Sequence, residues 1–299
     1  MVIVGGSLAG LQAALTLGRA RRSVVVIDDG RPRNGPAHHV HNFLGQAAPA
    51  PADLLASARS ELEPYDVVLV DARVDDVRAA AGFTVRTSDG GTRSSRAIVL
   101  ATGLTDDLPD VPGIAALWGG RVVACPHCHG WEVRDRPLAQ LGMRGRPARG
   151  LERAVLLSRW SRDVLLFTDG DELDDRQLAR AAAAGVEVCV ERVAGVTERP
   201  GGLQVALADG RTIGRHTIFT VVSQRQQSDL AARLGCDLVA DGPAAGAVEA
   251  DQTGRTSVAG VWAAGTTAFP ALLAIGAAGH ASTVATTLHS ALIEADLTS

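Results

Sequence analysis

The chain has 299 residues, of which 46% are hydrophobic and 21% are charged, a composition typical of a globular protein long enough for two domains. Its net charge of −4 and the lack of a Lys/Arg-rich run leave no basic surface for nucleic acid. No apolar run approaches the roughly 20 residues of a membrane helix. The chain opens directly on apolar Val2–Val4 without a signal-like segment, and four cysteines in this length indicate a reducing compartment. We therefore expect a cytoplasmic protein that binds neither nucleic acid nor membrane.

The first thirty residues read as a strand, a turn, a helix and a second strand. Apolar Val2–Val4 and Val24–Ile27 predict the strands, and the apolar positions within Leu11–Arg19 predict the helix. The turn consists of Gly5, Gly6, Ser7, Leu8, Ala9 and Gly10. Asp28 follows the second strand, where a carboxylate can bind the ribose hydroxyls of an adenosine. Together these features indicate a dinucleotide site with the pyrophosphate at the helix N-terminus, although Ser7 replaces the middle glycine of the usual pattern.

Two later strands also end in small residues. The apolar run Ala97–Gly103 ends in Ala101-Thr102-Gly103, and Gly260–Thr266 ends in Ala264-Gly265-Thr266. A helix rich in small residues is expected over roughly Leu272–Leu292. These segments are either core strands of an α/β sheet or additional parts of the dinucleotide site.

The segment Cys125-Pro126-His127-Cys128 is the most informative stretch of the chain. Two thiols at this spacing close a loop too short to constrain the unfolded chain much, so the pair suits a redox dithiol better than a structural staple. Half a zinc site is a second hypothesis, which His127 and His129 keep open although Cys189 and Cys236 stand alone in apolar surroundings. A coincidental pair of buried cysteines is a third.

Pro109–Gly113 breaks the pattern and predicts a hinge. Beyond it, alternating strands and helices predict a second βαβ domain that carries the dithiol. Its expected elements are strands over Pro137–Leu141, Asp163–Phe167 and Val186–Glu191, helices over Leu151–Trp160 and Asp174–Ala184, a hairpin of Leu203–Leu207 with Thr212–Ile213, and a returning strand over Ile218–Val222. The predicted fold is α/β, with residues 1–112 and 242–299 forming one domain and residues 113–241 a second domain inserted into it.

This layout resembles the low-molecular-weight thioredoxin reductase family over essentially the full chain. The resemblance implies two Rossmann-like dinucleotide-binding domains, with FAD in the first, and a homodimer. In that family an aspartate that bonds the ribityl chain usually occupies the position of Thr266, which can still make one such bond. The resemblance implies FAD contacts at the turn Gly5–Gly10 and at Asp28, Asp29, Asn42, Val74, Ala101, Thr102, Gly103, Gly265, Thr266, Leu273 and Ala274.

In the family the inserted domain binds NADPH, and here its nucleotide turn departs from that role. The turn runs from Gly142 to Gly150, and no Gly-x-Gly-x-x-Gly register fits, because Arg144 or Pro147 occupies the second glycine position. A side chain there obstructs the close backbone approach that a pyrophosphate needs. The alternative is that the three arginines of this turn form a phosphate site of their own; they are Arg144, Arg146 and Arg149.

The position that binds the 2′-phosphate of NADPH in the family also differs in this chain. The second strand of the inserted domain is followed by Asp169, Asp171 and Glu172 rather than by basic residues. Carboxylates would repel a phosphate there. We therefore expect a domain that is vestigial for nicotinamide.

The motif around the dithiol, Cys125–Glu132, resembles that of the dithiol oxidases that close the disulfides of gliotoxin, holomycin and related natural products. These are thioredoxin-reductase-like flavoproteins with a vestigial nicotinamide domain. Thioredoxin reductases usually carry an aspartate where this chain has His129. A histidine can both take and return a thiol proton near neutral pH. His129 is therefore the predicted catalytic base, with a helix-capping role as the alternative.

The remaining histidines near the site are less decisive. His127 lies between the cysteines and is as easily a solvent-facing residue as a functional one. A loop carrying His38, His39 and His41 precedes Asn42 and in this family runs near the flavin. Asn42 is expected to contact FAD or substrate, whereas the three histidines are more often part of a solvated loop.

The function predicted from these features is an FAD-dependent oxidase that forms an intramolecular disulfide in a small-molecule dithiol. The family resemblance implies that Cys125 is the sulfur farther from the flavin, so that a substrate thiolate attacks Cys125, Cys128 leaves and passes electrons to the flavin, and the second substrate thiol releases the product. O₂ then reoxidises the flavin and gives hydrogen peroxide. An NAD(P)H-dependent disulfide reductase of thioredoxin type and a non-catalytic flavin redox sensor are the alternatives. The substrate itself cannot be identified from the sequence.

Overall fold

The computed structural model describes residues 1–298, which divide into two compact units. Unit 1 comprises Met1–Gly35, Phe43–Thr105 and the chain from Gln224 onward. Unit 2 comprises Pro36–Asn42 and Asp106–Ser223. One unit is thus built from both ends of the chain, and the other contains the central segment together with a short piece of the N-terminal part.

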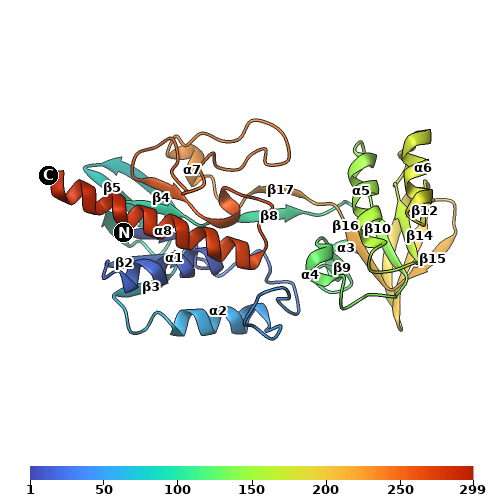
Figure 1. The fold of residues 1–299 in the computed structure, drawn as a ribbon, viewed down its shortest axis with the longest axis horizontal. Helices are drawn as coiled ribbons and strands as arrows, with labels where there is room; N and C mark the ends of the chain where they lie inside the picture. The colour runs from blue at the N-terminus through green and yellow to red at the C-terminus, as the bar shows by residue number, and fades with distance from the viewer. Residues whose placement is uncertain (299) are drawn as a thin grey trace. The chain divides into compact units, whose positions relative to one another are not determined.

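The observed boundaries correct the expected ones. Residues 224–241, expected in the inserted domain, belong to unit 1, where Leu230 and Cys236 are buried in one cluster with Val2. The expected hinge at Pro109–Gly113 lies inside unit 2, where the carbonyl of Pro112 accepts a hydrogen bond of 2.8 Å from the backbone of β13. The connections between the units are instead β8 (Leu104–Asp107) and β17 (Ser223–Gln226), which pair with each other (Figure 1).

Unit 1 is organised around a parallel five-stranded sheet. The strand order is β18-β7-β1-β2-β3, and every neighbouring pair runs parallel. The strands are β1 (Val2–Val4), β2 (Val24–Asp28), β3 (Val67–Asp71), β7 (Ile98–Leu100) and β18 (Val261–Ala263). Their short apolar stretches are typical of strands buried on both faces.

Different elements pack on the two faces of this sheet. The alternation of side chains along each strand tells which residues face which side. Ile3 belongs to the core shared with α1 (Leu8–Arg19) and α8 (Ala274–Thr298), which lie side by side (Figure 1). Val2 and Val4 point to the opposite face, because successive side chains alternate. The elements around that face are β4 (Val74–Ala80), β5 (Gly82–Thr87), β6 (Thr92–Ser95) and α7 (Leu230–Arg233). Unit 1 also contains α2 (Pro51–Ser60) and the 3₁₀ turn η1 (Gly265–Thr267).

Unit 2 repeats this architecture. Its parallel sheet has the order β12-β11-β10-β16-β9, and one face packs on helices while the other packs on an antiparallel three-stranded sheet. The strands are β9 (Val122–Val123), β10 (Leu138–Leu141), β11 (Val164–Phe167), β12 (Val186–Cys189), β13 (Val193–Arg199), β14 (Gly202–Leu207), β15 (Thr212–Arg215) and β16 (Thr217–Thr220). The helices are α3 (Ile114–Leu117), α4 (Pro126–His129), α5 (Pro147–Leu157) and α6 (Asp175–Ala183).

The predicted α/β fold with two Rossmann-like parallel sheets is confirmed. The hairpin across Asp209-Gly210 is present, and the predicted helices occur with shifted ends. The β4–β5–β6 sheet and β13 were not predicted, because their exposed faces carry charged residues that break the apolar runs. Across residues 1–298, no helix combines the length and apolar character of a membrane span.

Leu138→Ala should lower the free energy of unfolding by about 2–5 kcal/mol, because Leu138 is 0% exposed in the helix-facing core of unit 2. Leu178→Ala on α6 is the matched control, since that side chain is 44% exposed and its loss should cost less than about 0.5 kcal/mol. Urea unfolding followed by circular dichroism measures both. Equal effects would contradict the assignment of this core.

Candidate active site

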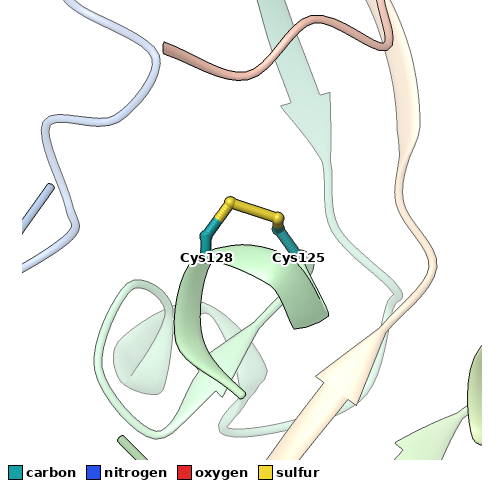
Figure 2. Close-up of a disulfide and its surroundings, with 2 residues drawn as sticks. All are labelled: Cys125 and Cys128. Atoms are coloured by element: carbon teal, nitrogen blue, oxygen red, sulfur yellow. A yellow bond between two sulfur atoms is a disulfide. The ribbon is translucent and has the colours of Figure 1, made fainter. Parts of the chain in front are cut away.

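The two cysteines of the motif form a disulfide on the short helix α4. Cys125 is the N-cap residue, with an extended backbone (φ −107°), and Pro126 occupies the first helical position, which proline favours. The carbonyl of Cys125 accepts hydrogen bonds from the backbone N–H groups of Cys128 and His129, each 3.2 Å long. Residues three apart lie on one face of a helix, so α4 brings both sulfurs together (Figure 2). The expected turn is therefore a helical turn.

The ring of His127 packs against Trp160. Its ring lies edge-on to Trp160, with 5.6 Å between the ring centroids, although the residue as a whole is exposed. Gly130 follows α4 and donates a backbone hydrogen bond of 2.7 Å to the carbonyl of Pro126. The structure thus gives His127 a contact that supports α4 rather than one with the sulfurs.

His129 has the environment of a neutral base. It is half-buried, and its Nδ1 makes no hydrogen bond of ordinary geometry among the described residues, although the nearby Cys125 backbone acts to raise the pKa of the ring. Burial is the main reason that the pKa of His129 is lowered, because a charged ring is poorly solvated there. A lowered pKa leaves the imidazole unprotonated at neutral pH, as an acceptor of a thiol proton must be.

The histidine-bearing segment Pro36–Asn42 groups with the disulfide rather than with the strands of unit 1. A Cβ placed on Gly119 would lie 2.1 Å from the carbonyl oxygen of Pro36, so the two backbones are in direct contact. The ring of His41 lies 6.3 Å from that of His129, measured between centroids. His41 Nδ1 is also 3.4 Å from a carboxylate oxygen of Glu132, a residue that the sequence reasoning did not select.

The predicted FAD contact of Asn42 stays a prediction. Asn42 belongs to unit 2, and its left-handed backbone (φ 56°) ends the histidine-bearing segment.

The turn after β1 in unit 1 brings two backbones into close contact. Gly5 has a φ of 102°, and a Cβ at Gly10 would lie 1.8 Å from the carbonyl oxygen of Gly5. A Cβ at Gly5 would in turn lie 2.4 Å from the carbonyl oxygen of Ala101. Only glycine fits both positions, and the absent side chains leave the backbone open to a phosphate group.

Asp28 is already oriented by this turn. Its Oδ1 accepts a hydrogen bond of 2.9 Å from the N–H of Gly6, and its Oδ2 lies 2.9 Å from Arg59 of α2. Ser7 is the N-cap of α1 but makes no side-chain cap hydrogen bond, so the first N–H groups of the helix can face a ligand. A pocket beside this carboxylate is lined by Asp28, Asp29, Gly30, Arg31, Asp71, Ala72, Arg73 and Ser88. Its position suits the adenosine half of a dinucleotide.

The other predicted contacts lie at the same edge of the sheet, because the carboxyl ends of parallel strands meet there. The N–H of Gly103 donates to Thr267 Oγ1 at 2.7 Å, and the N–H of Gly265 donates to His280 Nδ1 at 3.0 Å. Thr267 and His280 were missed by the sequence reasoning. The only signal was a histidine on the small-residue helix α8, and burial lowers the pKa of this ring, in keeping with an unprotonated Nδ1 acceptor.

Four of the predicted FAD contact residues differ in how available they are to a ligand. Val74 is buried in the core of unit 1, so its side chain is not available to a ligand. Asp29 is paired with Arg31, with 2.9 Å between Nε and Oδ2. Leu273 and Ala274 stand at the beginning of α8, where the Leu273 carbonyl accepts a 2.8 Å hydrogen bond from Ala277. The close-packed glycines Gly5 and Gly10 (the glycine cradle), the oriented carboxylate of Asp28 and the uncapped N-terminus of α1 together fit FAD.

The corresponding turn in unit 2 has a different form. Gly150 of α5 packs on Gly142, since a Cβ at Gly150 would lie 3.0 Å from the Gly142 Cα. These glycines stand eight positions apart, against five for Gly5 and Gly10, so the turn between them is longer.

Carboxylates of the loop that follows β11 bind to this longer turn. Arg144 Nε donates to Asp169 Oδ2 at 2.6 Å, and the N–H of Gly145 donates to Asp171 Oδ2 at 2.7 Å. Asp169 is 5% exposed and also accepts a 2.8 Å hydrogen bond from the N–H of Val193. These two carboxylates thus bind their own neighbouring turn, which refines the expectation that they simply repel a phosphate.

The metal hypothesis has no supporting geometry in the described part of the chain. Within residues 1–298, no group of three or more His, Cys, Asp or Glu side chains is arranged to hold a metal ion. Cys189 and Cys236 are buried free thiols, one in each unit.

Gly10→Ala should weaken FAD binding about tenfold or more, because the added Cβ forces α1 away from the Gly5 turn. Gly279→Ala on α8 is the control, since a Cβ there would meet no atom within 4 Å. The ratio of flavin to protein absorbance after gel filtration, together with a titration of the stripped protein with FAD, measures the effect. Equal flavin content in both variants would contradict the assigned cradle.

Comparison with known proteins agrees with this geometry. The model of the pyridine nucleotide-disulphide oxidoreductase family matches residues 1–291. Thioredoxin reductase tcpT of Claviceps purpurea is 31% identical over 277 residues, which cover 88% of this chain and 85% of the relative. The structure of an oxidoreductase from Agrobacterium tumefaciens is 34% identical with a TM-score of 0.91, covering 98% of this chain and 97% of the other. The structure of HlmI is 39% identical with a TM-score of 0.92, covering 99% and 93%. The chain therefore belongs to the pyridine nucleotide-disulphide oxidoreductase family, in which it is a flavin-dependent thiol–disulfide oxidoreductase of the low-molecular-weight thioredoxin reductase type.

Proposed function

We propose that the protein is an FAD-dependent dithiol oxidase that closes an intramolecular disulfide in a small-molecule natural product and uses O₂ as the electron acceptor, giving hydrogen peroxide. The observation that carries this proposal is the Arg144–Asp169 ion pair across the nucleotide turn of unit 2. We include in the proposal that the enzyme works in the cytoplasm as a homodimer, as its family resemblance implies.

The ion pair bears on function because it occupies the position where a nicotinamide dinucleotide needs open backbone. Moving Arg144 aside would leave Asp169, which is 5% exposed, as a buried carboxylate without its cation. Because the Asp169 carboxylate is nearly buried although Arg144 is 51% exposed, losing its cation would be unfavourable for Asp169. Electrons therefore have to reach the flavin from the dithiol side, which makes the protein an oxidase of dithiols rather than a reductase of disulfides.

The residues of the site can carry out each step of the exchange. A substrate thiol gives its proton to neutral His129, and the thiolate attacks Sγ of Cys125, which breaks the bond to Cys128. The second substrate thiol passes its proton to the Cys128 thiolate and attacks the mixed disulfide, which closes the product and releases Cys125 as a thiolate. The substrate thereby loses two electrons and two protons, and the enzyme is left with a reduced dithiol.

The cofactor supplies the remaining chemistry. FAD, held by the Gly5–Gly10 turn and Asp28, would accept the two electrons of the reduced dithiol and return them to O₂. The resting disulfide on α4 is then restored and the cycle can repeat.

A second candidate is an NAD(P)H-dependent disulfide reductase. One observation favours it: curated relatives with similar lengths, including tcpT and sirT of Leptosphaeria maculans, carry the name thioredoxin reductase. The two functions differ in the source of electrons, so a direct experiment separates them.

Under anaerobic conditions, NADPH or NADH should leave the flavin spectrum unchanged over minutes, because the Arg144–Asp169 pair closes the nucleotide turn. Dithiothreitol, used as a small dithiol probe, should bleach the flavin, and air should then restore the colour with formation of hydrogen peroxide. Spectra recorded after each addition measure both reactions. Rapid bleaching by either nicotinamide would reject the oxidase and favour the reductase.

Cys125→Ser and Cys128→Ser should each lower dithiol turnover on the order of 10³-fold or more, because either change removes the exchangeable disulfide. Cys236→Ala is the matched control, since Cys236 is a buried free thiol in unit 1. Oxygen uptake with dithiothreitol measures all three variants. If a variant of the pair keeps the wild-type rate, the disulfide is not the reacting group.

A further inference from the structure

A second pair of charged groups lies beside the dithiol, and the function described above does not use it. The Nδ1 atom of His41 lies 3.4 Å from Oε1 of Glu132, a contact that becomes an ion pair when the imidazole is protonated. The segment that carries His41 belongs to the same unit as α4, so His41, Glu132 and His129 lie in one compact unit. The rings of His41 and His129 are edge-on to each other, with 6.3 Å between their centroids.

The partial burial of the pair makes its charges effective. The side chain of His41 is 21% exposed and that of Glu132 is 38% exposed, so solvent screens them less than it screens a fully exposed pair. His129 has a buried Nδ1 that makes no hydrogen bond of ordinary geometry among the described residues, so its protonation depends strongly on nearby charge. A cation at His41 opposes a second positive charge on His129, whereas the Glu132 carboxylate favours it.

Other ionisable groups near α4 do not compete for this role. Helix α5 also packs on α4, but its charged side chains do not shift the pKa of His129. Arg134 lies over the ring of Trp131 at 4.0 Å and donates a 2.7 Å hydrogen bond to the Trp131 carbonyl. His39 faces His41, with 5.8 Å between ring centroids, and is the only other histidine ring in contact with it among the described residues.

We propose that the His41–Glu132 ion pair is a positioning device for the catalytic base: it holds the His41 ring against His129 and sets the pH range in which His129 accepts the substrate proton. The proposal rests on the assignment of the protein as a dithiol oxidase. His41 and Glu132 act through His129 and contact neither sulfur in this account.

The two members of the pair should shift His129 in opposite directions. In His41→Gln a potential cation disappears, so the pKa of His129 should rise by about half a pH unit. In Glu132→Gln the carboxylate disappears with little change in shape, so the pKa of His129 should fall by a similar amount. The acid limb of the pH–rate profile for anaerobic bleaching by dithiothreitol should move upward in the first variant and downward in the second.

Two independent readouts test this. The first is the pH–rate profile of the FAD-loaded protein, and the second is the titration of the His129 ring signal by NMR, assigned by its loss in His129→Gln. His216→Asn is the matched control, because it removes a histidine from the same unit whose ring contacts Thr217 and has no part in the charge environment of His129. Its profile should coincide with that of the wild type.

Opposite shifts in the two variants, with none in the control, support the proposal. Shifts in the same direction, or unchanged values of the His129 titration in both variants, overturn it. The NMR titration needs no turnover, so it still decides the proposal if dithiothreitol fails to bleach the flavin. That second failure would reject the oxidase function and not the role of the pair.

Discussion

The close contact between Gly10 and Gly5 is the constraint on which the rest of the site depends. With 1.8 Å between a hypothetical Cβ and the opposite carbonyl oxygen, helix α1 can approach β1 only because no side chain is present. This approach directs the N-terminus of α1 to the carboxyl edge of the sheet, where Asp28 is held by Gly6. The corresponding turn of unit 2 is longer and is closed by Arg144 and Asp169. One architecture thus occurs twice, with close-packed glycines in one turn and an ion pair with a carboxylate of the next loop in the other.

This difference is the basis of the proposal that electrons enter through the dithiol. If only one nucleotide turn is open, the electrons that reach the flavin have to come through Cys125 and Cys128. The surroundings of α4 suit that direction, because a half-buried histidine whose Nδ1 makes no hydrogen bond of ordinary geometry among the described residues can accept a thiol proton. The contact of His41 with Glu132 lies at the same place and is the basis of the proposed control of His129.

Local patterns predicted much of this from the sequence, and long-range packing accounts for what they missed. The Gly5–Gly10 turn, Asp28 and the Cys125–Cys128 spacing are signals within a few residues. The turn and Asp28 lie where they were expected at the ends of β1 and β2, with α1 beginning already at Leu8, whereas the dithiol lies on the short helix α4. The unit boundaries were wrong at the hinge, because Pro112 looked like a chain break but bonds to β13. Thr267, His280 and Glu132 were missed because each contacts a partner that is distant in the sequence. No local motif marks any of the three.

Oxygen uptake during turnover of a small dithiol, with no nicotinamide present, tests the central claim most directly. If the flavin receives its electrons only from the dithiol, each molecule of dithiothreitol oxidised should consume one molecule of O₂ and yield one of hydrogen peroxide, and the reaction should continue over many enzyme equivalents. Uptake that stops after one equivalent, or that requires NADPH or NADH to continue, would contradict the account.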